Sequence, residues 1–433
     1  MTIPLRVGVA GLGVVGTSLA RLLGRIRPDL ALRTGRDVHV AAVSARSNRD
    51  RGVDLAGAPF FLDPVALASH GEIDLFVELI GGADGAAYEA VKSALSRGVP
   101  VVTANKAMLA AHGVELATLA EKAGVALAFE AAVGGGVPVI KTLREGLAGN
   151  AVRRVSGILN GTCNYILSRM ETEGLPFAVC LAEAQRLGYA EADPTFDVGG
   201  FDTAHKLAIL ASIAFGTRID PGSVSVEGIE SITLADLAAA DELGFRIKLL
   251  GVAERTRHGI EQRVHPTMVA KTEPLAQIMG VLNAVAIDGD AVGSLTLVGA
   301  GAGGDATASA VAADIADIAR GVVTPAFGRP VATLIEAERA SMQRHEGGYY
   351  VRMSVAERPG AMAAIATRMG ERKISLEAIM QKRPPKDAPP GPHVTVVLIT
   401  HATTEASIRE ALELTVADGV VQPQPQVIRI ERA

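Results

Sequence analysis

The sequence predicts an α/β chain in three parts: a doubly wound parallel sheet, a central α+β part and a small C-terminal unit of ferredoxin-like order. Three observations support this prediction. Apolar strand patterns alternate with helical patterns up to about residue 130, long helical stretches mix with alternating strand patterns up to about 325, and the order βαββαβ follows from about 348. We therefore expect domains at residues 1–130, 131–325 and 348–433 of the 433-residue chain.

The first part starts with a short apolar strand at 5–10 and a glycine-rich turn at 11–16. The helical apolar spacing that follows is expected to end at Pro28, because proline breaks the hydrogen-bond ladder of a helix. Buried parallel strands are short, almost continuous apolar runs, and right-handed crossovers through helices connect them into a Rossmann-like sheet. Further strands are expected at 38–43, 75–79, 99–103 and 126–129, with helices at 62–70, 84–97 and 113–123.

The middle and the tail of the chain differ in their periodicity. In the middle, helices are expected at 176–188, 202–216 and 233–244, and strands at 248–254, 261–269 and 294–298. In the tail, strands are expected at 349–355, 374–381, 393–400 and 426–430, with helices at 361–370 and 403–417. A proline-rich loop at 383–392 joins two of these strands.

Composition and charge exclude several classes of partner. The formal net charge is −5 and aromatic residues make up 3% of the chain, without tryptophan, so neither a basic nor a stacking surface for nucleic acid is expected. No apolar run approaches the roughly 20 residues that cross a membrane, and the N-terminus has no signal-peptide pattern. The two cysteines, Cys163 and Cys180, cannot build a disulfide framework. We therefore expect a cytoplasmic protein that binds neither nucleic acid nor membrane.

The glycine-rich turn is a candidate dinucleotide site. Its three glycines have the spacing GxGxxG, follow a predicted strand and open a predicted helix. The first allows the tight turn, the second lets a pyrophosphate approach the backbone, and the third permits close packing, while the helix N-terminus supplies N–H groups. This interpretation is preferred over a merely structural turn. The expected cofactor contacts are Gly11, Leu12, Gly13, Val14, Val15 and Gly16.

The residues after the second strand bear on the choice of cofactor. A site for NAD has a carboxylate at this point for the ribose hydroxyls, whereas arginine suits the 2′-phosphate of NADP. The segment 43–52 contains Arg46 and Arg49 and no carboxylate before Asp50. NADP is therefore favoured, with Arg46 as a candidate contact. A solvated basic loop is the alternative interpretation, and NAD stays open.

The densest group of polar residues lies at 188–206. Asp202 and Lys206 are four residues apart at the start of an otherwise apolar helix, so their side chains share one helical face. An ordinary surface ion pair is the alternative, but the apolar sequence after Lys206 leaves no polar face for one. Such a lysine is a candidate for acid–base chemistry. Lys106 directly follows a predicted parallel strand, where ligands bind such sheets, unless it is simply a surface lysine.

Three further segments are candidates for chemistry or ligand contacts. Cys163 would be the nucleophile of a thioester-forming aldehyde dehydrogenase, with His205 as base, but a buried and inert thiol is the preferred interpretation. The glycine-rich turn within 130–141 is either a site for a monovalent cation or an interdomain hinge. The glycine-rich loop within 297–311 precedes a helix and is a second candidate for an anion or cofactor contact.

Taken in order, the motifs of this chain resemble those of bacterial-type homoserine dehydrogenases. The motifs are GLGVVG, VTANKA, EAAVGGGVPVI, SGILNGTCNYIL, LGYAEADPTFDVGGFDTAHKLAIL and LVGAGAGGDATASAV. The block at 188–206 is the most specific, and the resemblance covers essentially the whole chain. The tail from Tyr349 resembles an ACT domain, a regulatory module for small ligands, although Glu357 stands where its turn usually begins with aspartate.

The resemblance implies a reversible, NAD(P)-dependent interconversion of L-homoserine and L-aspartate 4-semialdehyde, on the route to threonine, methionine and isoleucine. It implies that Lys206 gives and takes the proton of the substrate oxygen, with Asp202 beside it. Glu191 and Asp202 would hold homoserine with Asp197 nearby, and Lys106 would lie between nicotinamide and substrate. The implied cofactor contacts include Gly188 and Gly303, and the implied sodium ligands, mainly through backbone carbonyls, are Glu130, Val133, Gly135 and Val137.

The same resemblance implies feedback regulation by an amino acid such as threonine at the ACT-like tail, and a homodimer or a homotetramer. Two other functions are alternatives: an aldehyde dehydrogenase that depends on Cys163, and a non-catalytic amino-acid sensor that retains a dinucleotide fold. The intact Asp202, Lys206 and Glu191 argue against the sensor.

Overall fold

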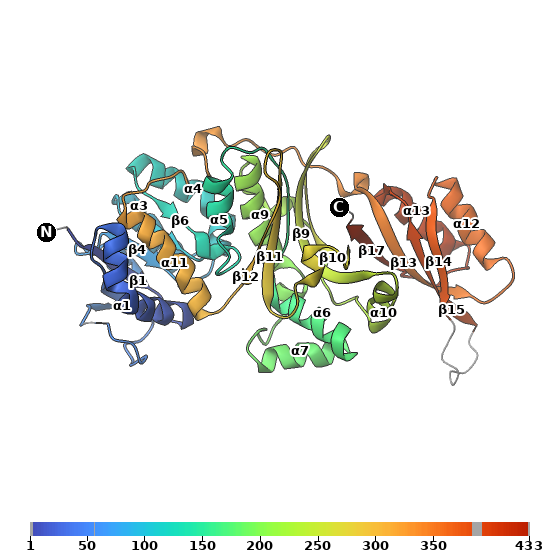
Figure 1. The fold of residues 1–433 in the computed structure, drawn as a ribbon, viewed down its shortest axis with the longest axis horizontal. Helices are drawn as coiled ribbons and strands as arrows, with labels where there is room; N and C mark the ends of the chain where they lie inside the picture. The colour runs from blue at the N-terminus through green and yellow to red at the C-terminus, as the bar shows by residue number, and fades with distance from the viewer. Residues whose placement is uncertain (1–2, 56, 383–391, 432–433) are drawn as a thin grey trace.

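The computed structural model describes residues 3–55, 57–382 and 392–431 (Figure 1). The N-terminal layers lie at one end of the molecule, the central sheet lies in the middle, and the C-terminal unit lies at the other end. The proline-rich loop predicted at 383–392 falls outside the described residues except for Pro392. Among the helices in the described ranges, none combines the length and the apolar character needed to cross a bilayer.

The N-terminal part contains the predicted parallel sheet. Within the described residues its strand order is β3-β2-β1-β4-β5-β6, and every neighbouring pair is parallel. Because the chain order reverses between β1 and β4, the carboxyl ends of these two strands border the crevice where such sheets bind ligands. The strands are β1 (Leu5–Ala10), β2 (Val38–Ser44), β3 (Phe60–Phe61), β4 (Leu75–Glu78), β5 (Val101–Thr103) and β6 (Leu127–Ala128).

The first helix of this part, α1 (Val14–Thr34), is longer than predicted. The expected end at Pro28 is wrong, because the proline lies inside the helix on its exposed side. The carbonyl that Pro28 leaves without a donor belongs to Gly24, which is also exposed, so water can replace the missing hydrogen bond. The other helices between these strands are α2 (Pro64–Ala68), α3 (Ala86–Ser96) and α4 (Lys106–Ala123).

A late helix completes the N-terminal core. Helix α11 (Gly304–Ala319) packs along α1 and buries Val311 and Ile315 in the same apolar cluster as β1 and β4. At its start, a Cβ added to Gly304 would lie only 2.5 Å from Ser18 Oγ of α1, so the two helices approach closely there. Although the sequence places α11 in the range 131–325, its apolar face therefore belongs to the core of the N-terminal part.

The central part packs helices on one face of a largely antiparallel sheet. Helix α9 (Phe201–Phe215) lies against β7 (Val152–Ile158), β9 (Phe245–Thr256) and β10 (Gly259–Ala270). A Cβ added to Gly251 of β9 would lie 3.0 Å from Thr203 Cγ2 of α9. Strands β7 and β11 (Leu282–Gly289) and helix α6 (Gly161–Glu173) were not among the predicted elements. Strand β7 carries two arginines in seven residues, which interrupt its apolar pattern. The strands are β7 (Val152–Ile158), β8 (Ser225–Val226), β9 (Phe245–Thr256), β10 (Gly259–Ala270), β11 (Leu282–Gly289) and β12 (Gly293–Ala300). The helices are α5 (Val139–Lys141), α6 (Gly161–Glu173), α7 (Phe177–Arg186), α8 (Thr195–Val198), α9 (Phe201–Phe215) and α10 (Leu234–Glu242).

The C-terminal unit follows the order βαββαβ, with strands arranged β17-β13-β15-β14 and every neighbouring pair antiparallel. Its last strand also pairs in parallel with β10, where Met268 lies opposite Ile430, so central and C-terminal strands form one continuous sheet. The elements are β13 (Glu346–Ala356), α12 (Ala361–Glu371), β14 (Leu376–Lys382), β15 (His393–Thr400), β16 (Thr403–Thr404), α13 (Glu405–Ala417) and β17 (Gln426–Glu431).

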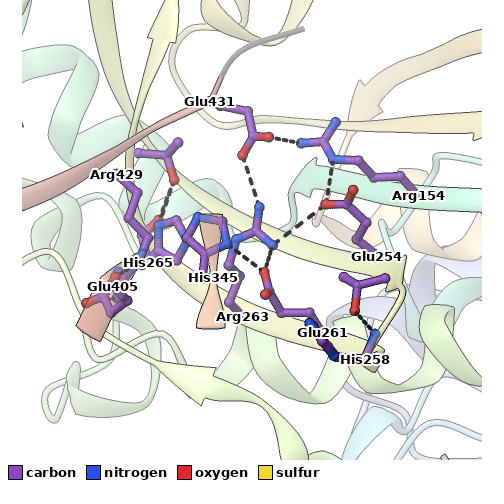
Figure 2. Close-up of polar contacts among 12 residues, drawn as sticks. Arg154, Glu254, His258, Glu261, Arg263, His265, His345, Glu405, Arg429 and Glu431 are labelled. Carbon is purple, nitrogen blue, oxygen red and sulfur yellow. Dashed lines mark hydrogen bonds and ion pairs between the residues drawn. The ribbon is translucent and has the colours of Figure 1, made fainter. Parts of the chain in front are cut away.

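Ion pairs that involve two buried arginines, Arg263 and Arg429, cross this junction (Figure 2). Glu431 of β17 lies between Arg154 of β7 (2.6 Å) and Arg263 of β10 (3.4 Å). On the same strand, Arg429 contacts Glu227 of the central part at 2.8 Å. It also contacts Glu405 of α13, within the C-terminal unit, at 2.9 and 3.0 Å. Because a buried charge that loses its partner is costly, the pairs of Arg263 and Arg429 couple the last strand to the central part.

Candidate active site

The centre of the site is a carboxylate held by two lysines from different parts of the chain. Asp202 lies in the first turn of α9 and is 4% exposed. Lys206, one turn further along, places its Nζ 2.7 Å from Asp202 Oδ2. Lys106, the first residue of α4, places its Nζ 2.9 Å from Asp202 Oδ1. The structure therefore brings together the two candidates that the sequence could only list separately.

Helix α4 positions Lys106 because it starts earlier than the sequence predicts. We expected a helix from 113, but Asn105 caps a helix that begins at Lys106 by accepting a hydrogen bond from the N–H of Met108 (3.1 Å). The lysine thus stands at the carboxyl end of β5, at the edge of the parallel sheet where ligands bind.

Two residues that the sequence analysis did not single out complete the polar cluster. The carbonyl oxygen of Leu159 accepts a hydrogen bond from Lys206 Nζ (2.7 Å). The amide of Asn160 donates to Asp202 Oδ2 (2.9 Å) and to Asp197 Oδ1 (2.8 Å), and so bridges both carboxylates. The only sequence signal was the position of Asn160 just before a helix, where its Oδ1 caps α6. For the Leu159 carbonyl there was none.

The pKa values of the two carboxylates in the cluster are shifted in opposite directions. Burial alone would raise the pKa of Asp202, but the ammonium groups of Lys206 and Lys106 outweigh it and hold that pKa below its usual range. Burial raises the pKa of Asp197, the hydrogen bond from Asn160 opposes this, and the nearby charge of Asp202 adds to it. Asp202 therefore stays ionised at neutral pH and keeps both lysines in place.

The segment before α9 lies partly outside this cluster. Glu191 is exposed, and its side chain makes no hydrogen bond or ion pair with any residue in the described ranges. Gly188 has a φ of +76° and is also exposed. The carbonyl of Tyr189 accepts a hydrogen bond from Thr162 of α6 (2.6 Å), which ties the segment to the rest of the site. The structure thus does not join Glu191 to Asp202, whereas it does bring Asp197 close.

The glycine-rich turn after β1 has the shape that a pyrophosphate needs. Gly11 has a φ of +101°, and an added Cβ there would lie 2.4 Å from the carbonyl oxygen of Leu79. A Cβ at Gly16 would lie 1.9 Å from the carbonyl oxygen of Gly11, so both positions need glycine for packing. Gly13, by contrast, is exposed and has nothing within 4 Å of an added Cβ. This open approach to the N-terminus of α1 fits a nicotinamide dinucleotide.

The loop after β2 is attached to that turn by an arginine that the sequence analysis did not single out. Arg51 donates from Nε to the carbonyl oxygen of Leu12 (3.1 Å) and from Nη2 to that of Ser47 (2.7 Å). Arg46 and Arg49 are exposed in the same loop. Because three arginines lie within six residues, the sequence alone does not indicate which of them contacts the glycine-rich turn. The loop therefore places positive charge beside the open turn.

The glycine-rich turn after β6 surrounds a buried carboxyl. Glu130 accepts hydrogen bonds from the backbone N–H groups of Ile140 and Lys141, both at 2.8 Å. Burial, together with the charge of Asp314, raises the pKa of Glu130 to about 7. Gly135 packs directly on the loop after β12, since an added Cβ would lie 2.5 Å from the carbonyl oxygen of Gly301. This contact joins the two glycine-rich loops that the sequence picked out.

Comparison with known proteins agrees with this geometry. The family model described as "Homoserine dehydrogenase, NAD binding domain" matches residues 11–130, and the model described as "Homoserine dehydrogenase" matches residues 138–316. Homoserine dehydrogenase of Pseudomonas aeruginosa is 44% identical over 436 residues, which cover 99% of each chain. Homoserine dehydrogenase of Neisseria gonorrhoeae is 41% identical over 434 residues, again with 99% of each chain covered.

The chain belongs to the homoserine dehydrogenase family. It is an NAD(P)-dependent oxidoreductase that acts on a CH–OH group, as the motifs had indicated. The structure of a homoserine dehydrogenase from Thiobacillus denitrificans matches it with a TM-score of 0.93 at 41% identity, covering 99% of both chains. A hyperthermophilic archaeal homoserine dehydrogenase in complex with NADPH matches with a TM-score of 0.61 at 26% identity, covering 72% of this chain and 97% of that one.

The thiol of Cys163 lies beside the polar cluster. That side chain is fully buried, and its Sγ contacts the carbonyl oxygen of Asp197 at 3.2 Å. Burial, reinforced by the nearby charges of Asp197 and Asp202, raises the pKa of the thiol well above its ordinary value. A thiolate nucleophile is therefore disfavoured, in agreement with the preferred interpretation of the sequence.

Cys163→Ala is accordingly expected to keep kcat and KM for homoserine close to those of the parent enzyme. Iodoacetamide should leave the native enzyme active at mildly alkaline pH, because the thiol is both buried and protonated. Mass spectrometry of the treated protein, before and after denaturation, provides the control for labelling. Loss of activity that parallels alkylation of Cys163 would support the thiol-dependent alternative instead.

Proposed function

We propose that the cluster of Asp202, Lys206 and Lys106 carries the proton transfer between L-homoserine and L-aspartate 4-semialdehyde. The observation that carries this proposal is the position of Lys206, which is mostly buried and oriented by Asp202 and the Leu159 carbonyl. A bound nicotinamide supplies the hydride acceptor in one direction and the hydride donor in the other. In alcohol oxidation, neutral Lys206 takes the hydroxyl proton as the carbon loses hydride, and then releases that proton to solvent. In the reverse direction, its ammonium form donates the proton to the aldehyde oxygen.

Carboxylates next to Lys206 suit the ammonium group of the substrate. Asp197 has one oxygen, Oδ1, bonded to Asn160, while Oδ2 has no hydrogen bond within the described ranges. The carboxylate of Glu191, on the segment that leads into α8, is exposed and has no side-chain partner within the described ranges. We assign Asp197, Glu191 and Asp202 to the amino end of homoserine, and Lys106 to the space between substrate and nicotinamide, because a dry ammonium group needs carboxylate partners.

We propose NADP as the preferred cofactor, with Gly188 and Gly303 among its contacts. The support is the basic loop after β2 beside the open glycine turn, together with Gly303, which has a φ of +109° at the start of α11. The NADPH complex of the archaeal relative agrees with this choice. The deciding assay follows reduced nicotinamide by its near-ultraviolet absorbance with L-homoserine and either NADP⁺ or NAD⁺. Binding of homoserine without turnover would favour the sensor alternative.

Arg46→Ala is expected to raise KM for NADP⁺ by about 10–100-fold, since a hydrogen bond to a charged phosphate is worth about 1.5–3 kcal/mol. KM for NAD⁺, which has no 2′-phosphate, should stay the same. Arg25→Ala, at an exposed position of α1, is the matched control and should change neither constant. Equal effects on both cofactors would remove Arg46 from the phosphate contact.

We also propose a sodium site at the turn that contains Val133, Gly135 and Val137, next to Glu130. These residues are buried, and the carbonyl oxygens of Val133 and Gly135 have no hydrogen-bond donor within the described ranges. Both carboxylate oxygens of Glu130 already accept backbone hydrogen bonds, so backbone carbonyls are the better ligands. Among the described residues, no group of three or more His, Cys, Asp or Glu side chains could hold a metal ion.

We propose that the C-terminal unit is an ACT domain that binds an amino acid such as threonine and inhibits the enzyme. The support is a cavity of about 400 Å³ at the turn before α12, where Gly360 has a φ of +87°. Glu357 and Arg358 line this cavity and could hold the two charged ends of an amino acid. We further propose a homo-oligomer, either dimer or tetramer, and a cytoplasmic location, since Cys163 and Cys180 are free thiols.

A further inference from the structure

The carbonyl oxygen of Leu159 accepts two hydrogen bonds, and only one of them comes from the proposed proton carrier. Lys206 Nζ donates at 2.7 Å, and Asn283 Nδ2 donates at 3.0 Å. Leu159 is fully buried, and Asn283 is 1% exposed. Because a carbonyl oxygen has two lone pairs, this arrangement satisfies it completely and leaves it one preferred orientation.

Asn283 comes from a distant part of the chain and reaches this carbonyl from the start of β11. Its amide fills the space above Gly301, where an added Cβ would lie 2.0 Å from Asn283 Cγ. A Cβ added to Gly161, on the other side, would lie 3.6 Å from Asn283 Oδ1. Asn283 thus lies between the loop after β12 and the start of α6, next to the carbonyl that orients Lys206.

The orientation of this amide follows from its neighbours. Only Nδ2 can approach the Leu159 oxygen favourably, because a flipped amide would place two acceptor oxygens together. Asn283 Oδ1 has no hydrogen-bond partner within the described residues, so the contact with Leu159 alone sets the direction of the side chain.

We propose that Asn283 is a positioning residue for Lys206. It holds the Leu159 carbonyl, and that carbonyl together with Asp202 fixes Nζ at the point of proton transfer. This inference rests on the proposed role of Lys206. It requires no contact between Asn283 and homoserine, which remains bound by the carboxylates and by Lys106.

Loss of the Asn283 donor frees one lone pair of a buried carbonyl. The peptide group at Leu159 can then rotate, and Lys206 Nζ loses a fixed acceptor. A misplacement of about 1 Å in a reacting group costs about 100-fold in rate, so Asn283→Ala should lower kcat by about 10–100-fold. KM for homoserine should change far less, because the groups that hold its amino end are untouched. This split distinguishes positioning from loss of binding.

Two variants and a matched control separate positioning from simple loosening of the fold. Asn283→Asp keeps the shape of the side chain but replaces the donor with an acceptor, and it should lower kcat at least as much as Asn283→Ala. Asn164→Ala removes another buried amide, which donates to the carbonyls of Ile278 (3.2 Å) and Leu282 (3.3 Å) and does not contact Leu159. It should lower the unfolding midpoint but leave kcat and its pH profile unchanged. A kcat loss in Asn164→Ala equal to that in Asn283→Ala would overturn the proposal.

The closing experiment is a double-mutant cycle on kcat with Lys206→Met and Asn283→Ala. If Asn283 acts through Lys206, Asn283→Ala should cause no further loss in the Lys206→Met background. Additive losses would overturn the positioning role of Asn283 and leave the role of Lys206 intact. Full activity of Lys206→Met alone would instead refute the proposed function, so the two failures are distinguishable.

Discussion

Lys206→Met is expected to lower kcat for homoserine oxidation by about 10³-fold, within the ~10²–10⁴-fold range that general acid–base groups contribute. Methionine keeps the length and apolar stem of the side chain but cannot carry a proton. The pH dependence that belongs to the proton carrier should disappear with it. Steady-state rates against pH, in both directions of the reaction, measure this effect. NADPH binding, followed by the fluorescence of the cofactor, should be unchanged because Lys206 lies outside the glycine-rich turn.

Lys248→Met is the matched control for this substitution. Lys248 is also buried, and its Nζ contacts Asn164 Oδ1 (3.0 Å) and the carbonyl oxygen of Ile278 (2.5 Å) rather than the catalytic cluster. Burial lowers the pKa of Lys248 to about 8. We expect its replacement to reduce stability without removing the pH dependence of kcat. The opposite pattern in the two variants would contradict our assignment.

Asp202→Asn is expected to have the second large effect, on stability as well as on activity. The substitution leaves two ammonium groups without their shared counter-charge and puts an amide N–H where one lysine now donates. Breaking a buried ion pair by removing one partner costs about 3–5 kcal/mol. Urea unfolding should therefore show a lower midpoint at neutral pH, and kcat should fall because Lys206 is no longer oriented.

The pH dependence of that stability loss follows from the direction of the Asp202 pKa. Because the folded protein holds this pKa below its unfolded value of about 3.9, the stabilisation is fully present above about pH 5. It is lost progressively as the pH falls through the folded pKa. The difference in unfolding free energy between the parent protein and Asp202→Asn should therefore be constant near neutrality and shrink in acid.

Asp197→Asn provides the control with the opposite sign. Burial holds the pKa of Asp197 above its ordinary value, so its ionisation costs stability as the pH rises through the folded pKa. The substitution should therefore relieve this cost at neutral pH and lose its advantage in acid. If both variants showed the same pH trend, the assignment of opposite pKa shifts to Asp197 and Asp202 would be wrong.

Local patterns predicted much of the fold. The parallel sheet of the first part follows from short apolar runs, since a strand buried on both faces needs no polar alternation. The predicted helix end at Pro28 is wrong because a proline on an exposed helical face removes only one hydrogen bond, which water replaces. The pairing of β17 with β10 had no local signal, because strand partners far apart in sequence are chosen by packing.

For the site, the sequence by itself determined the chemical groups and the family. The spacing of Asp202 and Lys206 already placed them on one helical face, and the motifs around them identified a homoserine dehydrogenase. Only the tertiary structure decided that Lys106 meets the same carboxylate, and that the Leu159 carbonyl is shared by Lys206 and Asn283. The physical reason is that a helix fixes contacts over a few residues, whereas hydrogen bonds between distant segments exist only once the core has packed them together.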